Sequence, residues 1–223
     1  MPENSLQKIT IDSEWDLVDL YRFPHSYTQV YAFLYSLSQA GRINSEAVSR
    51  IYRAHPWRGG YSSLNFYMSL YSAMEDEHIP TVHSIRYASL GYIEITALTI
   101  LVTQIRRIVT IVAQTIEIAD RTYDRIYKRA QKRKLLAMDV RRREREFERE
   151  EIKFMVESAE ELARIMSFDD LEKLQVRTRD PLGTMKILLS FYRRVRELVG
   201  FQLDQKVRFD CEAPQLDKKD SST

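Results

Sequence analysis

The longest regular pattern in the chain is a helical one in its middle. From Tyr92 to Asp180 there are 89 residues without a glycine or a proline, and apolar residues recur every three or four positions, which is typical of a helix close to a heptad repeat. The first series is Leu98, Leu101, Ile105, Ile108, Val112, Ile116, Ala119, Tyr123, Ile126 and Ala130, and it resumes at Leu136, Val140, Phe147, Phe154, Leu162 and Ile165.

This pattern predicts one long, coiled-coil-like helix over residues 97–166. A straight helix of that length would measure about 105 Å at ~1.5 Å per residue. The apolar series loses its large aliphatic residues between Ile126 and Leu136. A fold-back near Gln131–Asp139, giving an antiparallel pair of helices, is therefore the alternative.

The first 96 residues have shorter patterns. Lys8–Asp12 and Trp15–Leu20 are rich in strand-forming residues, and so are Val82–Ala88 and Tyr92–Ala97, so two hairpins are predicted. Between them, three segments have apolar residues at helical spacing, and Pro24 offers a start for the first. Residues 1–96 are therefore predicted to form a small α+β domain of the order ββ-ααα-ββ.

The C-terminal part again reads as helix. Ser167 can cap one helix, and Asp180-Pro181 predicts the start of another. That second helix has a strong apolar face and ends near Gly200, and a short extended piece over Phe201–Phe209 can follow it. We predict that 167–210 forms helices packed on the long helix and that 211–223 is a disordered tail. The predicted fold class is α+β, predominantly helical.

Composition changes this picture in three respects. The net charge of +2 divides into −3 for residues 1–100 (7 basic, 10 acidic) and +5 for residues 101–223 (27 basic, 22 acidic). The single cysteine, Cys211, favours a reducing compartment, and no signal peptide is recognisable, so a cytoplasmic protein is expected. No catalytic, metal or nucleotide motif stands out, so neither an enzymatic activity nor a cofactor is predicted.

The apolar stripe offers the first candidate for a functional surface. We interpret it as a packing or oligomerisation surface, formed by Leu98, Leu101, Ile105, Ile108, Val112, Ile116 and Ala119.

The segment Ile95–Ile116 also raises the question of a membrane, because it holds eleven Ile, Leu and Val residues beside Arg106 and Arg107. The aliphatic residues would contribute roughly −3 to −7 kcal/mol to insertion and the two arginines would cost roughly 5 to 7 kcal/mol. An ordinary spanning helix is not expected, whereas a helix lying on a bilayer is an alternative. Because the segment is rich in β-branched residues, a strand is another.

A basic stretch follows the stripe. Arg121–Lys134 holds seven basic residues and one acid, and we define its basic patch as Arg121, Arg125, Lys128, Arg129, Lys132 and Arg133. Such a helix can bind an anionic membrane surface or the phosphates of a nucleic acid. An acidic neighbour from the same chain, such as Glu144–Glu151 folded back, would neutralise it instead.

Two smaller features complete the candidates. The loop formed by Arg58, Gly59, Gly60 and Ser62 precedes a helix and could hold an anion on its backbone N–H groups, or be a plain turn with an N-cap. Glu75–His78 is the only cluster of acids and histidine, and suggests a metal, a basic partner or an exposed loop.

The sequence therefore favours a non-enzymatic interaction or oligomerisation protein, with a protein partner or a second copy as its ligand. Peripheral membrane association through 95–116 and 121–134 is the second hypothesis. Nucleic-acid binding through 121–134 is the third.

Overall fold

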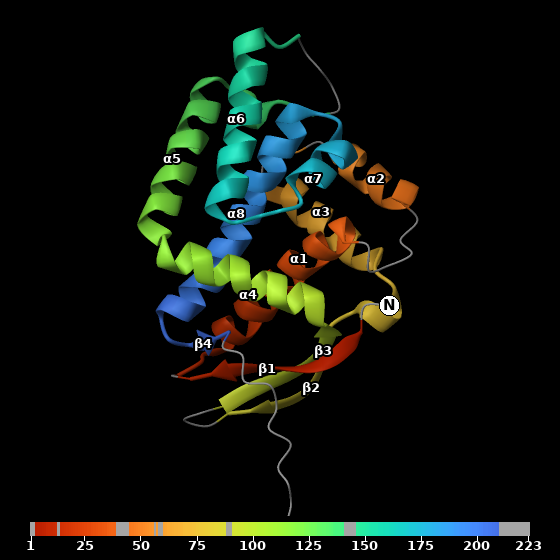
Figure 1. The fold of residues 1–223 in the computed structure, drawn as a ribbon, viewed down its shortest axis with the longest axis vertical. Helices are drawn as coiled ribbons and strands as arrows, with labels where there is room; N and C mark the ends of the chain where they lie inside the picture. The colour runs from red at the N-terminus through yellow and green to blue at the C-terminus, as the bar shows by residue number, and fades with distance from the viewer. Residues whose placement is uncertain are drawn as a thin grey trace, which may run out of the picture.

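A computed structural model describes residues 3–12, 14–38, 45–55, 57, 60–87, 91–140 and 146–209. Within them the chain is mostly helical, with eight α-helices and one four-stranded antiparallel sheet (Figure 1), which confirms the predicted α+β class. The strands are β1 (Asn4–Ile11), β2 (Thr81–Arg86), β3 (Gly91–Leu98) and β4 (Val207–Arg208). The helices are α1 (Leu17–Leu37), α2 (Ser45–Ala54), α3 (Gly60–Ser72), α4 (Thr99–Gln114), α5 (Ile116–Lys132), α6 (Arg149–Ile165), α7 (Leu171–Thr178) and α8 (Pro181–Leu203), with 3-10 turns η1 (Asp76–His78) and η2 (Leu135–Ala137).

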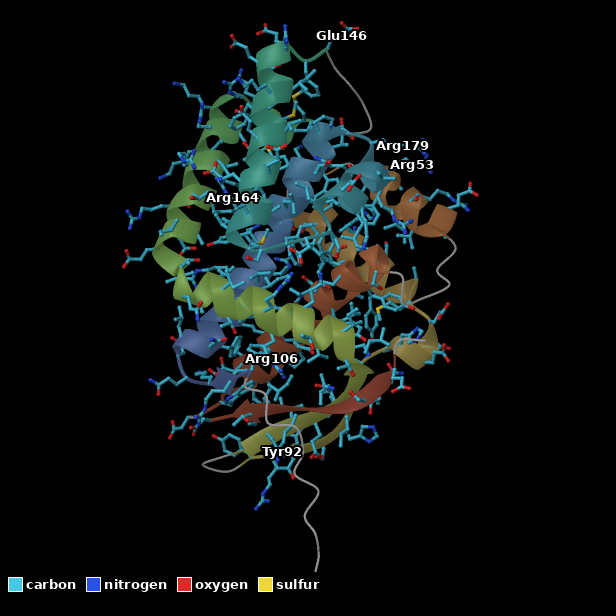
Figure 2. All side chains as sticks on the ribbon, viewed as in Figure 1. Arg53, Tyr92, Arg106, Glu146, Arg164 and Arg179 are labelled. Atoms are coloured by element: carbon cyan, nitrogen blue, oxygen red, sulfur yellow. The ribbon has the colours of Figure 1, made fainter. Side chains whose placement is uncertain are left out.

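The sheet closes one end of the molecule and has one buried face. Its strand order is β2-β3-β1-β4, so both ends of the chain contribute a strand. Alternate residues such as Ile9 and Ile93 pair across β1 and β3 and are buried, as the period of two in a strand requires. Tyr92, one residue before Ile93, lies on the side away from the helices (Figure 2), where Lys8 sits 3.9 Å from the centre of its ring.

Helix α8 forms the centre of the helical layer. All residues from Leu182 to Tyr192 are buried, and α8 packs against α1, α4 and α6 (Figure 1). A helix that is apolar around most of its circumference can bury all of its apolar side chains only when other elements surround it. The predicted start is confirmed, because the Asp180 side chain accepts a hydrogen bond of 2.6 Å from the Gly183 amide.

The prediction of a single long helix over 97–166 is wrong. The segment contains α4, α5, η2 and α6, and α4 and α5 meet at 91°. The break falls at Thr115, whose φ of −119° is not helical and whose hydroxyl bonds the Ile111 carbonyl at 2.9 Å, as threonine does when it competes for backbone acceptors. The apolar face of α4 is buried against α8 and α1, and that of α5 against α6 and α8. Two helices at an angle can therefore each bury an apolar face on different neighbours, which one straight helix could not do.

The fold-back occurs within the range that the sequence offered as an alternative. Lys134 adopts a left-handed conformation, with φ of 57°, just after α5 ends. Helix α6 then runs antiparallel to α5 (Figure 1), with an ion pair between Arg125 and Glu161 and Arg133 5.0 Å from the ring centre of Phe154. The left-handed residue is a lysine, so no glycine was there to signal the turn.

The predicted N-terminal hairpin is also wrong. The sequence predicts a strand over Trp15–Leu20, but Leu17 begins α1, and Asp16 and Asp19 form a capping box. Strand β1 pairs with β3 instead. Pro24, the predicted start of the helix, lies inside α1. The second predicted hairpin, β2 with β3, is confirmed.

Candidate functional site

The apolar stripe lies in the core of this chain. Leu98, Leu101, Ile105, Ile108, Val112 and Ala119 are buried, and Ile116 is partly buried against the same core. Their covering surface comes from the chain's own helices, chiefly α8 and α1. The stripe therefore has the packing role that its periodicity indicated, and in this fold it does not reach the surface that a partner would meet.

The basic patch lies on the outer side of α5 and is partly neutralised. Arg121 pairs with Glu117 at 3.0 Å, and Arg125 pairs with Glu161 of α6. Arg129 and Arg133 lie over the ring of Phe154. Lys128 and Lys132 are exposed. Helix α6 thus supplies an acidic neighbour through Glu161, whereas the predicted neighbour Glu144–Glu151 lies partly outside the described residues.

None of the described helices alone has the length and apolar content of a membrane span. Helices α4 and α5 have the required length and apolar content only when they are taken together, across their 91° bend. The predicted anion loop of Arg58, Gly59, Gly60 and Ser62 cannot be placed, because Arg58, Gly59 and the side chain of Ser62 lie outside the described part of the chain.

The structure brings the acid–histidine cluster together. Nδ1 of His78 lies 3.1 Å from Glu75 Oε2, Nε2 lies 3.7 Å from Glu77 Oε1, and potential ligand atoms of the three residues lie within 4.8 Å of one another. Tyr35 also contacts Nδ1 at 2.9 Å, and Tyr31 donates to the His78 carbonyl at 3.1 Å. These contacts explain the cluster, because they hold the turn between α3 and β2 in place.

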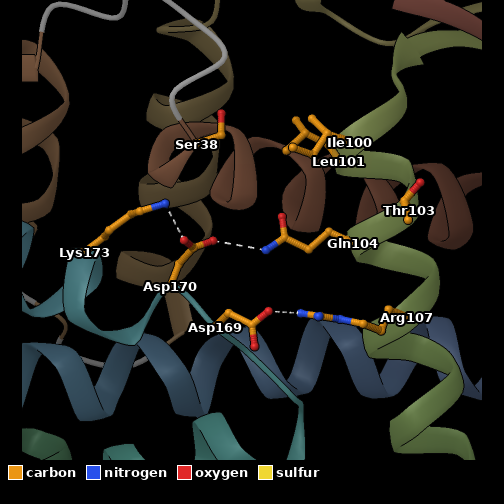
Figure 3. A pocket seen from close by; sticks show the side chains of 9 residues that line it. All are labelled: Ser38, Ile100, Leu101, Thr103, Gln104, Arg107, Asp169, Asp170 and Lys173. Atoms are coloured by element: carbon orange, nitrogen blue, oxygen red, sulfur yellow. Dashed lines mark hydrogen bonds and ion pairs between the residues drawn. The ribbon is translucent and has the colours of Figure 1, made fainter. Parts of the chain in front are cut away.

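A wide cleft of about 570 Å³, lined by both apolar and charged side chains, lies between α4 and the start of α7. Figure 3 shows Arg107 facing Asp169, and Asp170 held between Lys173 and Gln104. Gln104 donates to Asp170 at 3.1 Å and Lys173 donates at 2.6 Å. Because its charged groups bind one another, this cleft is best explained as the junction that fixes α7 to α4.

The candidate site is an apolar groove between α1 and α3. Its volume is about 360 Å³, and it is bordered by large apolar residues that are exposed, including Tyr21 at 65% and Met68 at 50%. Leu20 also lines it, and the same two helices carry further exposed apolar side chains, Leu17 and Val18 on α1 and Leu64 on α3. Exposed apolar side chains gathered in one place mark interaction sites more often than scattered ones do.

The floor of the groove carries a polar relay. Arg194 of α8 donates to the Gln29 side-chain oxygen and lies 5.5 Å from the ring centre of Tyr67. The amide nitrogen of Gln29 is therefore left to donate to Nε2 of His25, 2.6 Å away. His25 must accept this bond, so the relay favours its neutral form.

Burial lowers the pKa of His25 below its usual 6.5, the charge of Arg194 lowers it further, and Glu197 opposes them. We expect a histidine NMR titration to give a His25 pKa below 6.5, and Arg194→Gln to raise it. Since the unfolded chain binds this proton more readily, the contribution of His25 to stability is present above pH 6.5 and is lost as pH falls through the lowered pKa. A His25 pKa unchanged by Arg194→Gln would contradict this account of the relay.

The strand predicted over Trp15–Leu20 conceals one wall of this groove, because Leu20 lies in α1 beside Tyr21 and lines the groove. Leu17, Tyr21 and Pro24 recur at helical spacing, a signal that could have revealed it. Comparison with family models, with curated proteins and with solved structures finds no match for this chain.

Proposed function

We propose that this protein is a non-enzymatic binding protein whose α1–α3 groove receives an acidic amphipathic helix of a protein partner. The observation that carries the proposal is the gathering of exposed apolar residues on these two helices, among them Leu20, Tyr21 and Met68. Covering such residues contributes roughly 25 cal/mol for each Å² of apolar surface removed from water.

The shape of the groove favours a helix as its occupant. Leu17, Tyr21, Pro24 and Thr28 form one ridge along α1, about 17 Å long at ~1.5 Å per residue, which corresponds to three turns of a helix laid beside it. Met68, on the opposite wall, has a flexible side chain that adapts to irregular partners. An amphipathic helix in an apolar groove is a common mode of recognition.

The charges around the groove favour an acidic helix. None of the described residues that line it is acidic. Arg194, beneath the floor, bonds Gln29 and the ring of Tyr67 and forms no ion pair with a carboxylate among the described residues. A glutamate or aspartate at the edge of the partner helix would complement this charge and fix its orientation.

Selection from a display library of amphipathic helical peptides, about 14 residues long and with randomised flanking charges, tests the proposal. We expect the selected peptides to carry an acidic residue beside the apolar stripe. Met68→Glu should weaken their binding about tenfold or more, because it places a charge in the apolar contact. Arg194→Gln should weaken acidic peptides more than variants in which the acid is replaced by glutamine.

Ile152→Glu is the matched control, since Ile152 is a similarly exposed apolar residue on α6, with 42% exposure. Binding that survives Met68→Glu, or selected peptides that are basic, would contradict the proposal. Sedimentation of the free protein adds a further check, because self-association abolished by Met68→Glu would make a second copy the occupant instead.

The basic patch of α5 gives weaker support to the membrane and nucleic-acid hypotheses. Arg121 and Arg125 are paired with acids of the same chain, so fewer charges remain for lipid headgroups or phosphates.

A further inference from the structure

A second, smaller cavity lies near the N-terminal half of α3, away from the groove. Its volume is about 140 Å³, enough for several water molecules or a small anion. Five parts of the chain line it. They are Trp57 before α3, Ser63 in α3, Tyr127 in α5, Leu136 in η2, and Lys186, Leu189 and Arg193 in α8. It belongs neither to the groove nor to the cleft of Figure 3.

The polar groups that line this cavity are mostly hydrogen-bond donors. They are the indole N–H of Trp57, the hydroxyls of Ser63 and Tyr127 and the guanidinium of Arg193, together with two leucines, and none of the described lining residues is acidic. The ammonium of Lys186 also borders the cavity, but its three N–H groups are used on backbone carbonyls. The Ser63 hydroxyl shares a hydrogen bond with Ser190. Hydroxyls can also accept, but the indole and the guanidinium can only donate. A ligand that offers several acceptor atoms would match them.

One side of the cavity carries a positive charge. Arg193 is exposed and forms no ion pair with a carboxylate among the described residues, so its guanidinium can attract an anion. Lys186, which is 5% exposed, has a structural role here, because it donates to the carbonyls of Trp57, Leu136 and Met138 at 3.0, 3.1 and 2.5 Å.

Trp57 supplies an independent observation. It is 4% exposed, and its Nε1 is buried with no hydrogen-bond acceptor among the described residues. Buried polar groups of this kind are nearly always satisfied. The backbone of Trp57 is also left-handed, with φ of 52°, which is uncommon for a bulky residue and is found where the surroundings impose it.

We infer that this cavity is an oxyanion site suited to a phosphate group. Its donors come from four separate elements, so a tetrahedral group with several acceptor oxygens fits them better than a planar carboxylate. The aromatic rings of Trp57 and Tyr127 and the two leucines provide an apolar border for the rest of a small phosphorylated molecule. This site is independent of the proposed groove, and either can exist without the other.

Tryptophan fluorescence tests the site, because the chain has only two tryptophans. Trp15 packs against Phe23 and Phe201, so Trp15→Phe is a conservative background in which Trp57 alone reports. Titration of this variant with inorganic phosphate, against sodium chloride of the same ionic strength, should give a saturable change in emission. Sulfate should act similarly, and acetate should act only at higher concentration.

In that background Arg193→Gln should weaken phosphate binding about tenfold or more, since hydrogen bonds to charged groups are the strongest of those available. Tyr127→Phe should weaken it by a smaller factor while preserving the ring. Lys128→Gln, on the exposed side of α5, is the control for general attraction to basic residues and should change binding less than twofold. A signal that does not saturate, that chloride reproduces, or that survives Arg193→Gln would overturn the inference.

Discussion

An Ile108→Asp variant is expected to lose its cooperative fold. Ile108 is fully buried in α4, and a carboxylate there would be removed from water without a partner. The loss of isoleucine packing and the burial of a polar group together cost on the order of 5 kcal/mol or more, which is comparable with the whole stability of a typical domain, about 5–15 kcal/mol. Far-UV circular dichroism and a thermal melt would show the loss.

Ile100→Asp is the matched control on the same helix, because Ile100 is 60% exposed. Its melting temperature should stay within a few degrees of the parent. The pair separates the two interpretations of the stripe. If Ile108→Asp kept its melting temperature and instead dissociated an oligomer, the stripe would be an assembly surface, as the sequence alone suggested.

Lys186→Met should destabilise the protein by about 3–5 kcal/mol. The substitution keeps most of the aliphatic volume but removes the donor for three backbone carbonyls, and each buried acceptor left without a partner costs about 1–3 kcal/mol before relaxation. Trp57 precedes α3, whereas Leu136 and Met138 follow α5, so the lysine fixes two connections onto α8. Urea unfolding would measure the change.

Lys173→Met is the control for removal of a lysine charge. Lys173 lies at the surface in an ion pair with Asp170, and exposed pairs of this kind contribute about 0–1 kcal/mol. A loss of less than 1 kcal/mol for Lys186→Met would show that the three carbonyls find other partners. Because Lys186 also lines the oxyanion cavity, the phosphate experiment uses Arg193 rather than this residue.

The groove and the cavity depend on the same helix. Tyr67 lines the groove and Ser63 lines the cavity, one turn apart on α3. Neither site follows from a local motif, because each combines side chains from segments far apart in the sequence. Met68 and Tyr21, for example, are separated by 47 positions, and Trp57 and Arg193 by 136.

Local interactions made several features predictable from the sequence alone. The Asp180 cap that starts α8 acts within three residues, and the alternation in β3 reflects a single strand with one buried face. The three-and-four spacing of Leu101, Ile105, Ile108 and Val112 correctly identified helix and burial. Such signals depend on residues only a few positions apart, so they can be recognised without knowing how the rest of the chain folds.

Only the tertiary structure decided where the elements end and what they pack against. The stripe of α4 meets α8, about 80 residues later in the chain, and the need to bury two stripes on different neighbours bends the chain at Thr115 without a glycine or a proline. In the same way β1 pairs with β3 rather than with residues 15–20, which form α1. Periodicity predicts that a face is buried, but the packing of the whole chain determines which distant surface buries it. The same packing brings together the residues that line the groove and the cavity.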